Sequence, residues 1–455
     1  MIKRKLKEVA NMLKGEIVED KYEYIEIEGV SIDTRTINEN QLFVPVVGEN
    51  NDGHKYIEMA SDKGASAALW DKKNPIPETD IPLILVEDTT KGLQNLAKEY
   101  NKQIGARVIG VTGSNGKTST KDIIESILKS KYKTHKTHGN LNNEYGLPLT
   151  VLFADDDTEM LVLEMGMSGL GDIRMLCDIA PPDIAVITNS TDVHINDLGS
   201  VENILKAKME IAEGLKECGL LVYLGDSFPL KKAVENLDRN IKKISFGEES
   251  HNNYVTQFES AENMGINFKV GDNKYFLPML GRYNIFNAGA AVGVVEYLGF
   301  RPDEIQEAIL EVNATGLRNE LIKGENFHIL NDAYKSNPIS LRFALQTLYD
   351  LEGYSQKIIV LGDMFGTGDN EVENHITIGE EIDPNQVDMV FTLGKLGEYF
   401  AKGAEKNFSK DKIHSFKDLD RLVDDLRLNI KKNSIILLKG SRILRMERII
   451  DKIFE

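Results

Sequence analysis

The chain has 455 residues, more than one ordinary hydrophobic core accommodates, so its length predicts two to four domains. Hydrophobic residues make up 41% of the sequence and charged residues 28%, the usual balance for a globular protein. The formal net charge of −18 argues against general binding to nucleic acid or to an anionic membrane surface, so we expect neither as a partner.

The N-terminal segment is basic but does not resemble a signal peptide. Lys7 and Glu8 interrupt the apolar core that such a peptide needs, and the apolar residues at positions 6, 9, 10 and 13 have helical spacing. No apolar run approaches the length of a membrane span. Cys177 and Cys218 provide neither a disulfide framework nor zinc-ligand spacing, so we expect two buried free thiols. These features predict a cytoplasmic protein without membrane insertion.

Three blocks follow one another along the chain. Residues 1–88 mix short apolar alternations with turn residues and end in the apolar run 81–86. Residues 89–315 alternate strands with helices, which is typical of a mostly parallel α/β sheet. Strands are expected there at 108–111, 160–163, 184–187 and 220–224, with a β-rich insert at about 241–280.

The last block, residues 316–455, repeats the alternation. Its strands are expected at 327–330, 357–361, 389–393 and 434–438, each followed by a polar residue or a glycine. Functional side chains gather at the carboxyl ends of strands in open parallel sheets. The sequence therefore predicts an α/β fold in which the third block is a second doubly wound domain.

The most informative motif is the stretch Thr112-Gly113-Ser114-Asn115-Gly116-Lys117-Thr118, followed by Ser119. It stands between an apolar strand and a helical pattern with apolar residues at 123, 124, 127 and 128. Such a turn aims backbone N–H groups at phosphate, while the lysine neutralises charge and the threonine hydroxyl binds Mg²⁺. Val111 stands where a standard Walker A motif has glycine, which gives the shorter spacing TGxxGKT. We expect a nucleoside triphosphate site rather than a chance glycine-rich turn.

Polar residues follow the next two strands. Glu164 comes directly after strand 160–163, at the sheet edge of the phosphate loop, so its carboxylate is a candidate ligand of Mg²⁺. Taken alone, it would more often be an ordinary strand-end acid. The strand 184–187 leads to His194, and a lone histidine is usually structural.

Lys208 lies in the middle of an apolar helical face within residues 201–217, whereas Lys206 lies on the polar side. Desolvation lowers the pKa of such a lysine and favours the neutral amine. Two interpretations stay open at this point. Lys208 is either a lysine whose stem covers apolar surface, or an amine that adds CO₂ to give a carbamate able to ligate Mg²⁺.

Together these motifs resemble the Mur ligase family of ATP-dependent amide-bond-forming enzymes, over essentially the whole chain. The segments that carry the resemblance are TGSNGKTSTKD (112–122), GNLNNEYGLPLT (139–150), LEMGMSGLGDI (163–173), HINDLGSVENILKAKMEI (194–211), GRYNIFNAGAA (281–291), LNDAYKSNP (330–338), LGDM (361–364) and LKGSR (438–442). In the first block, SIDTR (31–35) and LFVPVVGENNDGH (42–54) look like the nucleotide-sugar domain of the family.

The resemblance implies three domains: a small α/β nucleotide-sugar domain at 1–88, a central phosphate-loop ATPase domain at 89–315 and a C-terminal Rossmann-like domain at 316–455 that binds the amine substrate. It implies a reaction of peptidoglycan synthesis in which the carboxylate of a UDP-muramoyl-tripeptide attacks the γ-phosphate of ATP. An acyl phosphate and ADP result, and the amine of D-Ala-D-Ala then displaces phosphate. The expected partners are these small molecules, and the expected state is a monomer.

The resemblance also implies the roles of individual residues. Lys117 and its loop would bind the ATP phosphates, and Thr118 and Glu164 would hold one Mg²⁺. His194 and a carbamylated Lys208 would serve a second metal site. The remaining implied contacts are Arg318 near the γ-phosphate, Asp332 near the ribose, Asn284 and Asn287 near the adenine, and Ser31, Thr34, Arg35, Asn140, Asn142 and Asn143 on the UDP-linked substrate.

The chain departs from the family pattern at three places. Lys335 and Ser336 follow Tyr334 where the family usually has Asn-Ala, residues 365–368 replace the usual ELG after LGDM, and residues 189–193 differ from the loop that usually precedes His194. The first two departures lie in the domain that would bind the amine, so a variant ligase with another amine acceptor is the main alternative.

Three other functions are weaker alternatives. The SIDTR segment argues against a folylpolyglutamate synthase, and a phosphate-loop kinase would not explain the Lys208 helix or the third domain. A non-catalytic protein that binds cell-wall precursors would not need Lys117, Thr118, Glu164, His194 and Lys208 together.

Overall fold

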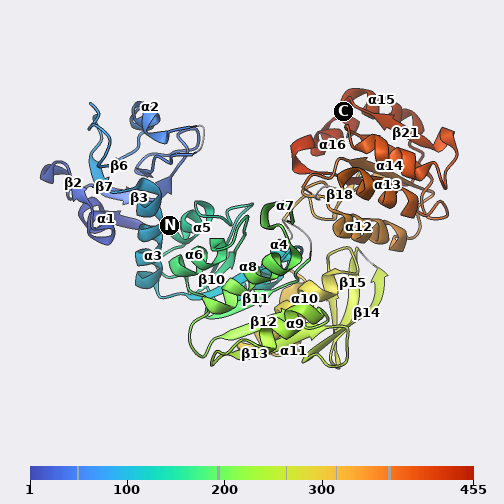
Figure 1. Cartoon of the computed structure of the whole chain (residues 1–455), viewed down its shortest axis with the longest axis horizontal. Coiled ribbons are helices and arrows are strands. Elements are labelled where there is room, and N and C mark those ends of the chain that lie inside the picture. Colours follow the sequence, from blue (N-terminus) through green and yellow to red (C-terminus); the bar gives the residue numbers. More distant parts are fainter. Residues whose placement is uncertain (49–50, 192–194, 263, 314, 367–369, 455) are drawn as a thin grey trace.

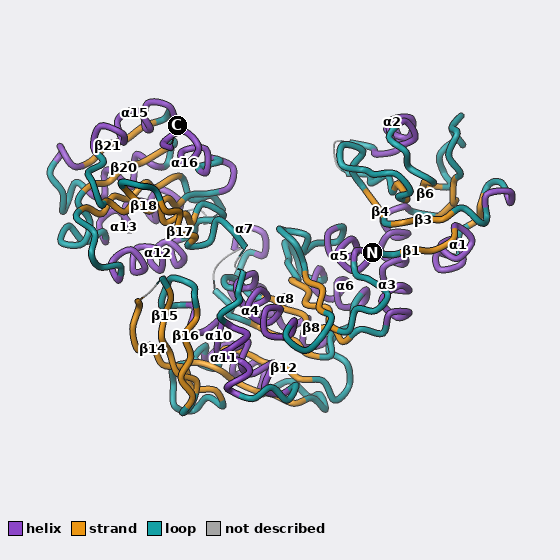
Figure 2. Tube along the Cα trace, turned by 180° about the vertical axis from the view of Figure 1, so that it is seen from behind, coloured by secondary structure: helices purple, strands orange, loops and turns teal. Residues whose placement is uncertain are grey.

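The computed structural model describes residues 1–48, 51–191, 195–262, 264–313, 315–366 and 370–454. They form three units, and Figure 1 shows the first and the third on opposite sides of the central one. Each unit is built on its own β-sheet, with helices packed against it (Figure 2). The predicted α/β architecture with three units is confirmed.

The first unit contains a five-stranded sheet in the order β2, β7, β6, β5, β4 and a separate antiparallel pair of β1 and β3. Its strands are β1 (Lys3–Lys5), β2 (Glu16–Ile17), β3 (Glu26–Glu28), β4 (Val30–Ser31), β5 (Leu42–Phe43), β6 (Ala67–Asp71) and β7 (Leu83–Val86). Its helices are α1 (Leu6–Leu13), α2 (Ile57–Asp62) and α3 (Thr89–Ile104), the last of which leads into the central unit.

The central unit contains a nine-stranded sheet in the order β16, β15, β14, β13, β12, β11, β8, β10, β9. The strands β8 to β14 are parallel to their neighbours, whereas β14, β15 and β16 pair antiparallel and form the predicted β-rich insert. The strands are β8 (Arg107–Thr112), β9 (Thr134–Lys136), β10 (Met160–Glu164), β11 (Ile184–Ile187), β12 (Leu220–Leu224), β13 (Lys242–Gly247), β14 (Tyr254–Glu262), β15 (Gly265–Val270) and β16 (Asn273–Leu277).

Two sets of helices cover the central sheet. Apolar side chains of α4 (Lys117–Lys129), α10 (Asn284–Tyr297) and α11 (Pro302–Ile309) pack on one face, and those of α5 (Gly146–Phe153), α6 (Asp172–Ile179) and α8 (Val201–Glu213) pack on the other. The short helices α7 (Ile195–Leu198) and α9 (Phe228–Glu235) complete the unit. After β8 the chain crosses to the edge at β9 and returns to β10, and β11 then pairs with the other side of β8. The end of β8 is thus a topological switch point, where α/β sheets bind ligands.

The third unit contains a six-stranded sheet in the order β17, β18, β22, β19, β20, β21, in which only β17 is antiparallel to its neighbour among the described pairs. The strands are β17 (Glu320–Lys323), β18 (Phe327–Asp332), β19 (Gln356–Gly362), β20 (Met389–Leu393), β21 (Ile413–Phe416) and β22 (Ser434–Lys439). The helices are α12 (Pro338–Asp350), α13 (Glu371–Glu381), α14 (Gly397–Ala404), α15 (Leu419–Asn429) and α16 (Glu447–Phe454). The strands expected in the two sheets agree with those observed to within one or two residues.

The first and the central units share one apolar cluster. It runs from Leu6 and Leu69 in the first unit, through Leu93 of α3, to Val108 and Leu147 in the central unit. Most of the apolar core of the third unit lies in two other clusters, one of which also includes Leu280 of the central unit. The first two units are therefore joined by buried apolar surface.

One expectation about an individual residue needs correction. Cys177 is buried, but Cys218 is exposed, because it lies in the turn between α8 and β12 with a backbone φ of 59°. The expected apolar stripe on α4 is buried, and so is every other residue from 118 to 128, Lys121 and Asp122 among them. In the part of the chain that the structure describes, no helix is both long enough and apolar enough to cross a bilayer.

Tyr100 of α3 offers a test of the joint between the first two units. Its side chain is fully buried, and its hydroxyl donates a hydrogen bond of 2.8 Å to the carbonyl of Ala154. Tyr100→Phe leaves this carbonyl without that donor, so we expect a loss of about 1–2 kcal/mol in the free energy of unfolding, measured by urea denaturation. Tyr24→Phe is the control because Tyr24 is 68% exposed, and equal effects of both changes would contradict the prediction.

Candidate active site

A cavity of about 630 Å³ lies between the central and the third units, at the end of β8. The whole stretch 112–119 lines it, together with Glu164 and Lys208 of the central unit. The third unit contributes Arg318 and a group of residues beside its β18 and β22 strands. The predicted phosphate loop, acidic residue and buried lysine are therefore brought together in one place.

The phosphate loop depends on two glycines. Gly113 has a φ of +148°, and a Cβ added there would lie 1.9 Å from Oγ1 of Thr188. Gly116 has a φ of +82°, and a Cβ there would lie 2.3 Å from Oδ1 of Asn287. Because an L side chain would be both strained and in collision at these positions, only glycine lets the backbone turn here. The turn leaves the N-terminus of α4 facing the cavity, and the first N–H groups of this helix have no backbone partner in the part of the chain that the structure describes.

Lys117 begins α4 and folds back over the loop. Its ammonium donates a hydrogen bond of 2.7 Å to the carbonyl of Gly113. The pKa of Lys117 is lowered to about 8, chiefly by burial, with Glu164 acting in the opposite direction and the positive charges of Lys335 and Arg318 adding to the effect of burial. A nearby anion such as a phosphate would stabilise the buried ammonium of Lys117, so the arrangement is suited to a negatively charged ligand.

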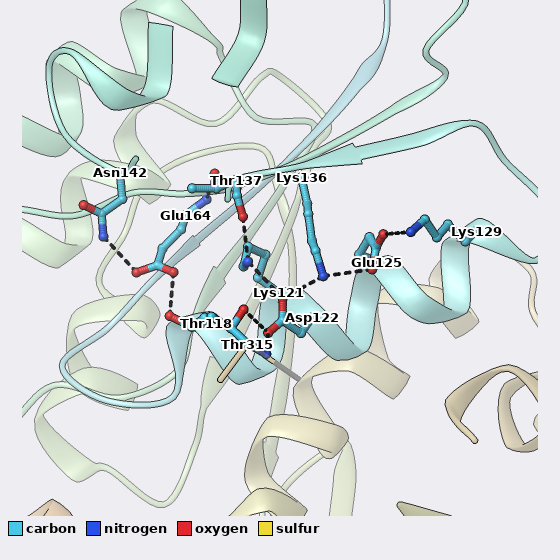
Figure 3. A network of polar contacts seen from close by, with 10 residues as sticks. All are labelled: Thr118, Lys121, Asp122, Glu125, Lys129, Lys136, Thr137, Asn142, Glu164 and Thr315. Carbon is cyan, nitrogen blue, oxygen red and sulfur yellow. Dashed lines mark hydrogen bonds and ion pairs between the residues drawn. The ribbon is translucent and has the colours of Figure 1, made fainter. Parts of the chain in front are cut away.

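Glu164 and Thr118 form the part of the site that fits Mg²⁺. The Thr118 hydroxyl donates a 2.7 Å hydrogen bond to Oε2 of Glu164, and the Asn142 amide donates a 2.8 Å bond to Oε1 (Figure 3). The Glu164 side chain is buried, and both of these partners are neutral groups. A buried carboxylate beside a hydroxyl and an amide oxygen is the oxygen donor set that Mg²⁺ prefers.

Lys208 is almost fully buried in α8, as its place in the apolar face predicted, and Lys206 is exposed. The Lys208 ammonium lies 3.9 Å from the sulfur of Met167. Burial, together with the nearby charges of Lys117 and Lys335, lowers the pKa of Lys208 to about 6. The amine is consequently mostly neutral at pH 7, whereas fewer than about one in a thousand ordinary lysines are.

The third unit closes the cavity with charged and aromatic side chains. The Arg318 guanidinium lies 4.2 Å from the centre of the Tyr334 ring. Asp332 accepts a 2.5 Å hydrogen bond from the ammonium of Lys439, which is itself buried. The sequence interpretation did not single out Lys439, although its place directly after strand 434–438 was the signal that could have found it.

A direct hydrogen bond joins the phosphate loop to the third unit. The amide of Asn337, the N-cap of α12, donates to Oδ1 of Asn115 at 3.1 Å. Lys335, two residues before it, lines the cavity, and its pKa is lowered because the surrounding protein removes part of its hydration. Lys335 and Ser336, which depart from the family pattern, thus directly precede the residue that is bonded to the phosphate loop.

The expected adenine pair, Asn284 and Asn287, lies at the start of α10. Asn287 lines the cavity and donates a 2.7 Å hydrogen bond to Oδ1 of Asn284. Asn284 is buried behind it and donates to the carbonyl of Leu280, so it does not line the cavity. Asn284 therefore orients Asn287 in this structure.

The residues expected on the UDP-linked substrate fall into two groups. Asn140, Asn142 and Asn143 line the cavity. Ser31, Thr34 and Arg35 lie in the first unit at and after β4 and do not line it, and Arg35 pairs with Asp33 at 2.6 Å. His194, expected in the second metal site, lies outside the described residues.

Comparison with protein-family models matches all three units. The model of the Mur ligase family, catalytic domain, matches residues 26–101, the Mur ligase middle domain matches 111–295 and the Mur ligase, glutamate ligase domain matches 317–442. The chain belongs to the Mur ligase family.

Individual relatives match over the full length. The UDP-N-acetylmuramoyl-tripeptide–D-alanyl-D-alanine ligase of Bacillus subtilis is 44% identical, over 100% of this chain and 99% of the relative. Two solved structures have similar folds. MurF of Acinetobacter baumannii has a TM-score of 0.89 at 25% identity, covering 100% of this chain and 99% of the other. MurF ligase of Thermotoga maritima, in complex with ADP, has a TM-score of 0.82 at 31% identity, covering 94% and 97%.

The close approach at Gly113 can be tested by substitution. Gly113→Ala places a methyl group against Thr188, so we expect the loop to shift and ATP to bind at least about tenfold more weakly by calorimetry, or about 1.4 kcal/mol. Gly105→Ala is the control, since Gly105 also has a positive φ, of +65°, but has no atom within 4 Å of the added Cβ. Unchanged ATP affinity in Gly113→Ala would contradict this account of the loop.

Proposed function

We propose that this Mur ligase joins D-alanyl-D-alanine to UDP-N-acetylmuramoyl-tripeptide with consumption of ATP, in the synthesis of peptidoglycan precursors. The observation that carries the proposal is the 44% identity to the Bacillus subtilis ligase of that name over both full chains. The cavity supports it because its phosphate loop, buried carboxylate and cations suit a nucleoside triphosphate and a second anionic substrate. The likeness to a relative solved with ADP supports the use of ATP.

The proposed reaction has two steps. An oxygen of the tripeptide's terminal carboxylate attacks the γ-phosphorus, the bond to the β-γ bridging oxygen breaks, and ADP leaves. The free amine of the dipeptide then attacks the acyl carbon, the nitrogen loses its proton, and inorganic phosphate leaves. Both steps bring negative charges together, so Lys117 and Arg318 would act chiefly by neutralising charge and aligning the reactants.

The residues present fit a divalent cation at Thr118 and Glu164, and they would hold Mg²⁺ there. Mg²⁺ bound there would supply positive charge that neutralises the phosphates of ATP. Lys208 would serve a second site as its carbamate, together with His194, and the lowered pKa of Lys208 supports this because only the neutral amine adds CO₂.

The remaining parts of the proposal concern organisation. We propose that residues 1–88 bind the UDP moiety through Ser31, Thr34 and Arg35, that 89–315 bind ATP, and that 316–455 bind the amine. Asn287 would contact the adenine with Asn284 behind it, and Asp332, fixed by Lys439, would contact the ribose. The enzyme would act in the cytoplasm as a monomer.

The acceptor is tested by a screen. We expect phosphate release from ATP only when UDP-muramoyl-tripeptide and D-Ala-D-Ala are both present, with a product whose mass equals their sum less one water. Because Lys335 and Ser336 depart from the usual pattern, other amino acids and dipeptides belong in the same screen. Product formed with another amine alone would replace the proposed acceptor, and ATP turnover without the nucleotide sugar would contradict the ligase.

The state of Lys208 is tested by ¹³C spectroscopy. In ¹³C-bicarbonate, the wild type should give a carbamate signal that declines as the pH falls through about 6, since protonation removes the reactive amine. Lys208→Ala should lose the signal and about tenfold to a hundredfold of the activity, partly restored by a small carboxylic acid. Lys206→Ala, on the exposed side of the same helix, should keep both. Full activity in Lys208→Ala would show that the lysine only covers apolar surface.

A further inference from the structure

A buried network of charged residues lies behind the phosphate loop, on α4. One carboxylate oxygen of Asp122, Oδ1, lies 2.9 Å from the ammonium of Lys121 and 2.9 Å from that of Lys136 (Figure 3). Lys136 also contacts Glu125 at 3.0 Å. Lys121 and Asp122 are almost fully buried, so their charges are compensated within the protein rather than by solvent.

The other oxygen of Asp122 holds the connection to the third unit. Oδ2 accepts hydrogen bonds from the backbone N–H of Thr315 at 2.9 Å and from its hydroxyl at 2.7 Å (Figure 3). Thr315 lies between α11, which packs on the central sheet, and β17, the first strand of the third sheet. The Asp122 carboxylate thus binds Thr315 at the point where the chain passes from the central unit to the third unit.

The two hydrogen bonds from Thr315 to Asp122 are stronger than hydrogen bonds between neutral groups of a loop. Burial alone raises the pKa of Asp122, but the ammonium groups of Lys121 and Lys136 outweigh it and hold the pKa below its ordinary value. The acceptor of both Thr315 bonds is therefore an ionised carboxylate, and charge-assisted hydrogen bonds are shorter and stronger than neutral ones. Because Oδ1 is fixed by two ammonium groups, Oδ2 has little freedom to move with the connection.

The same network reaches the residue expected to hold Mg²⁺. The ammonium of Lys121 donates a 2.7 Å hydrogen bond to the carbonyl of Thr137. The hydroxyl of Thr137 accepts a 2.9 Å bond from the backbone N–H of Glu164. Two adjacent residues of α4 therefore make these connections. Lys121 is linked through Thr137 to Glu164 of β10, and Asp122 is bonded to Thr315.

We propose that Asp122 is a positioning residue for Arg318, acting through Thr315. Arg318 follows Thr315 by three residues and lines the cavity, whereas Lys117 precedes Asp122 by five residues on α4. By fixing Thr315 on this helix, Asp122 sets the place of the Arg318 guanidinium relative to the phosphate loop. The inference rests on the proposed function in one respect, namely that Arg318 acts on the γ-phosphate.

The informative variant is Thr315→Val, which removes the hydroxyl donor and keeps the backbone N–H and the shape. Asp122→Asn is less suitable, because it would leave the buried ammonium groups of Lys121 and Lys136 without their shared carboxylate and would destabilise the fold. Thr256→Val is the matched control. Thr256 is buried in β14, and its hydroxyl has no hydrogen-bond partner among the described residues.

The measurement compares the affinity for ADP with that for β,γ-methylene ATP, by calorimetry on the full chain. If Asp122 positions Arg318, Thr315→Val weakens the binding of the ATP analogue about tenfold and leaves that of ADP unchanged, since only the analogue has a γ-phosphate. Thr256→Val changes neither. Equal weakening of both ligands, or no change in either, would overturn the proposal.

The same substitution in an Arg318→Lys variant shows whether the loss of affinity caused by Thr315→Val depends on Arg318. In Arg318→Lys, Thr315→Val should change the affinity for the analogue less than twofold, because the group that it positions is already altered. A full tenfold loss in this background would overturn the proposal. Since these are binding measurements, absence of ligase activity with every acceptor would remove the proposed function without deciding this test.

Discussion

Repulsion among the cations around one cavity is the constraint on which this structure depends. The cations Lys117, Lys335 and Arg318 line it, together with Lys439, whose charge is balanced by Asp332. The charges of Lys117 and Lys335 add to burial in lowering the pKa of Lys208, which keeps that amine mostly neutral. Lys335 and Arg318 come from the third unit. Bringing the units closer without a ligand therefore concentrates positive charge, whereas a triphosphate and a carboxylate reverse the sign of the interaction. The charge of the substrates favours a tightly closed cavity.

Two features of α4 and the loop before it bear on this repulsion: the backbone turn at the loop glycines and the buried network around Asp122. Glycines at 113 and 116 let the loop approach Thr188 and Asn287 closely, so that the N-terminus of α4 faces the ligand. Farther along the same helix, Asp122 compensates Lys121 and Lys136, which would otherwise add to the positive charge near the loop. The start of α4 is therefore positively charged, through Lys117 and the helix N-terminus, whereas about one turn later the charges of Lys121 and Asp122 compensate each other.

Sequence patterns predicted the parts of this site that follow directly from strand ends. The loop after β8, Glu164 after β10 and the buried Lys208 each have a local signal, either a motif or a charged residue in an apolar face. The Asp122–Thr315 contact has none, because it joins residues 193 positions apart. Helical periodicity also assigns Lys121 and Asp122 to a solvent-facing side, since it takes charge as a sign of exposure. Their burial arises from β9 and from the connection to the third unit, which pack against the side of α4 that a lone helix would expose.

The apolar cluster that the first two units share has a mechanical consequence. Because α3 contacts β6 of the first unit and also α5 and α6 of the central unit, buried apolar surface and not only the chain connection joins the first unit to the central one. If the UDP moiety binds at Ser31, Thr34 and Arg35 as proposed, the span from there to the phosphate loop is set by the protein alone. The peptide of the substrate must bridge that span with its own length. The fixed span between the two sites would then select substrates by the number of amino-acid residues in their peptide.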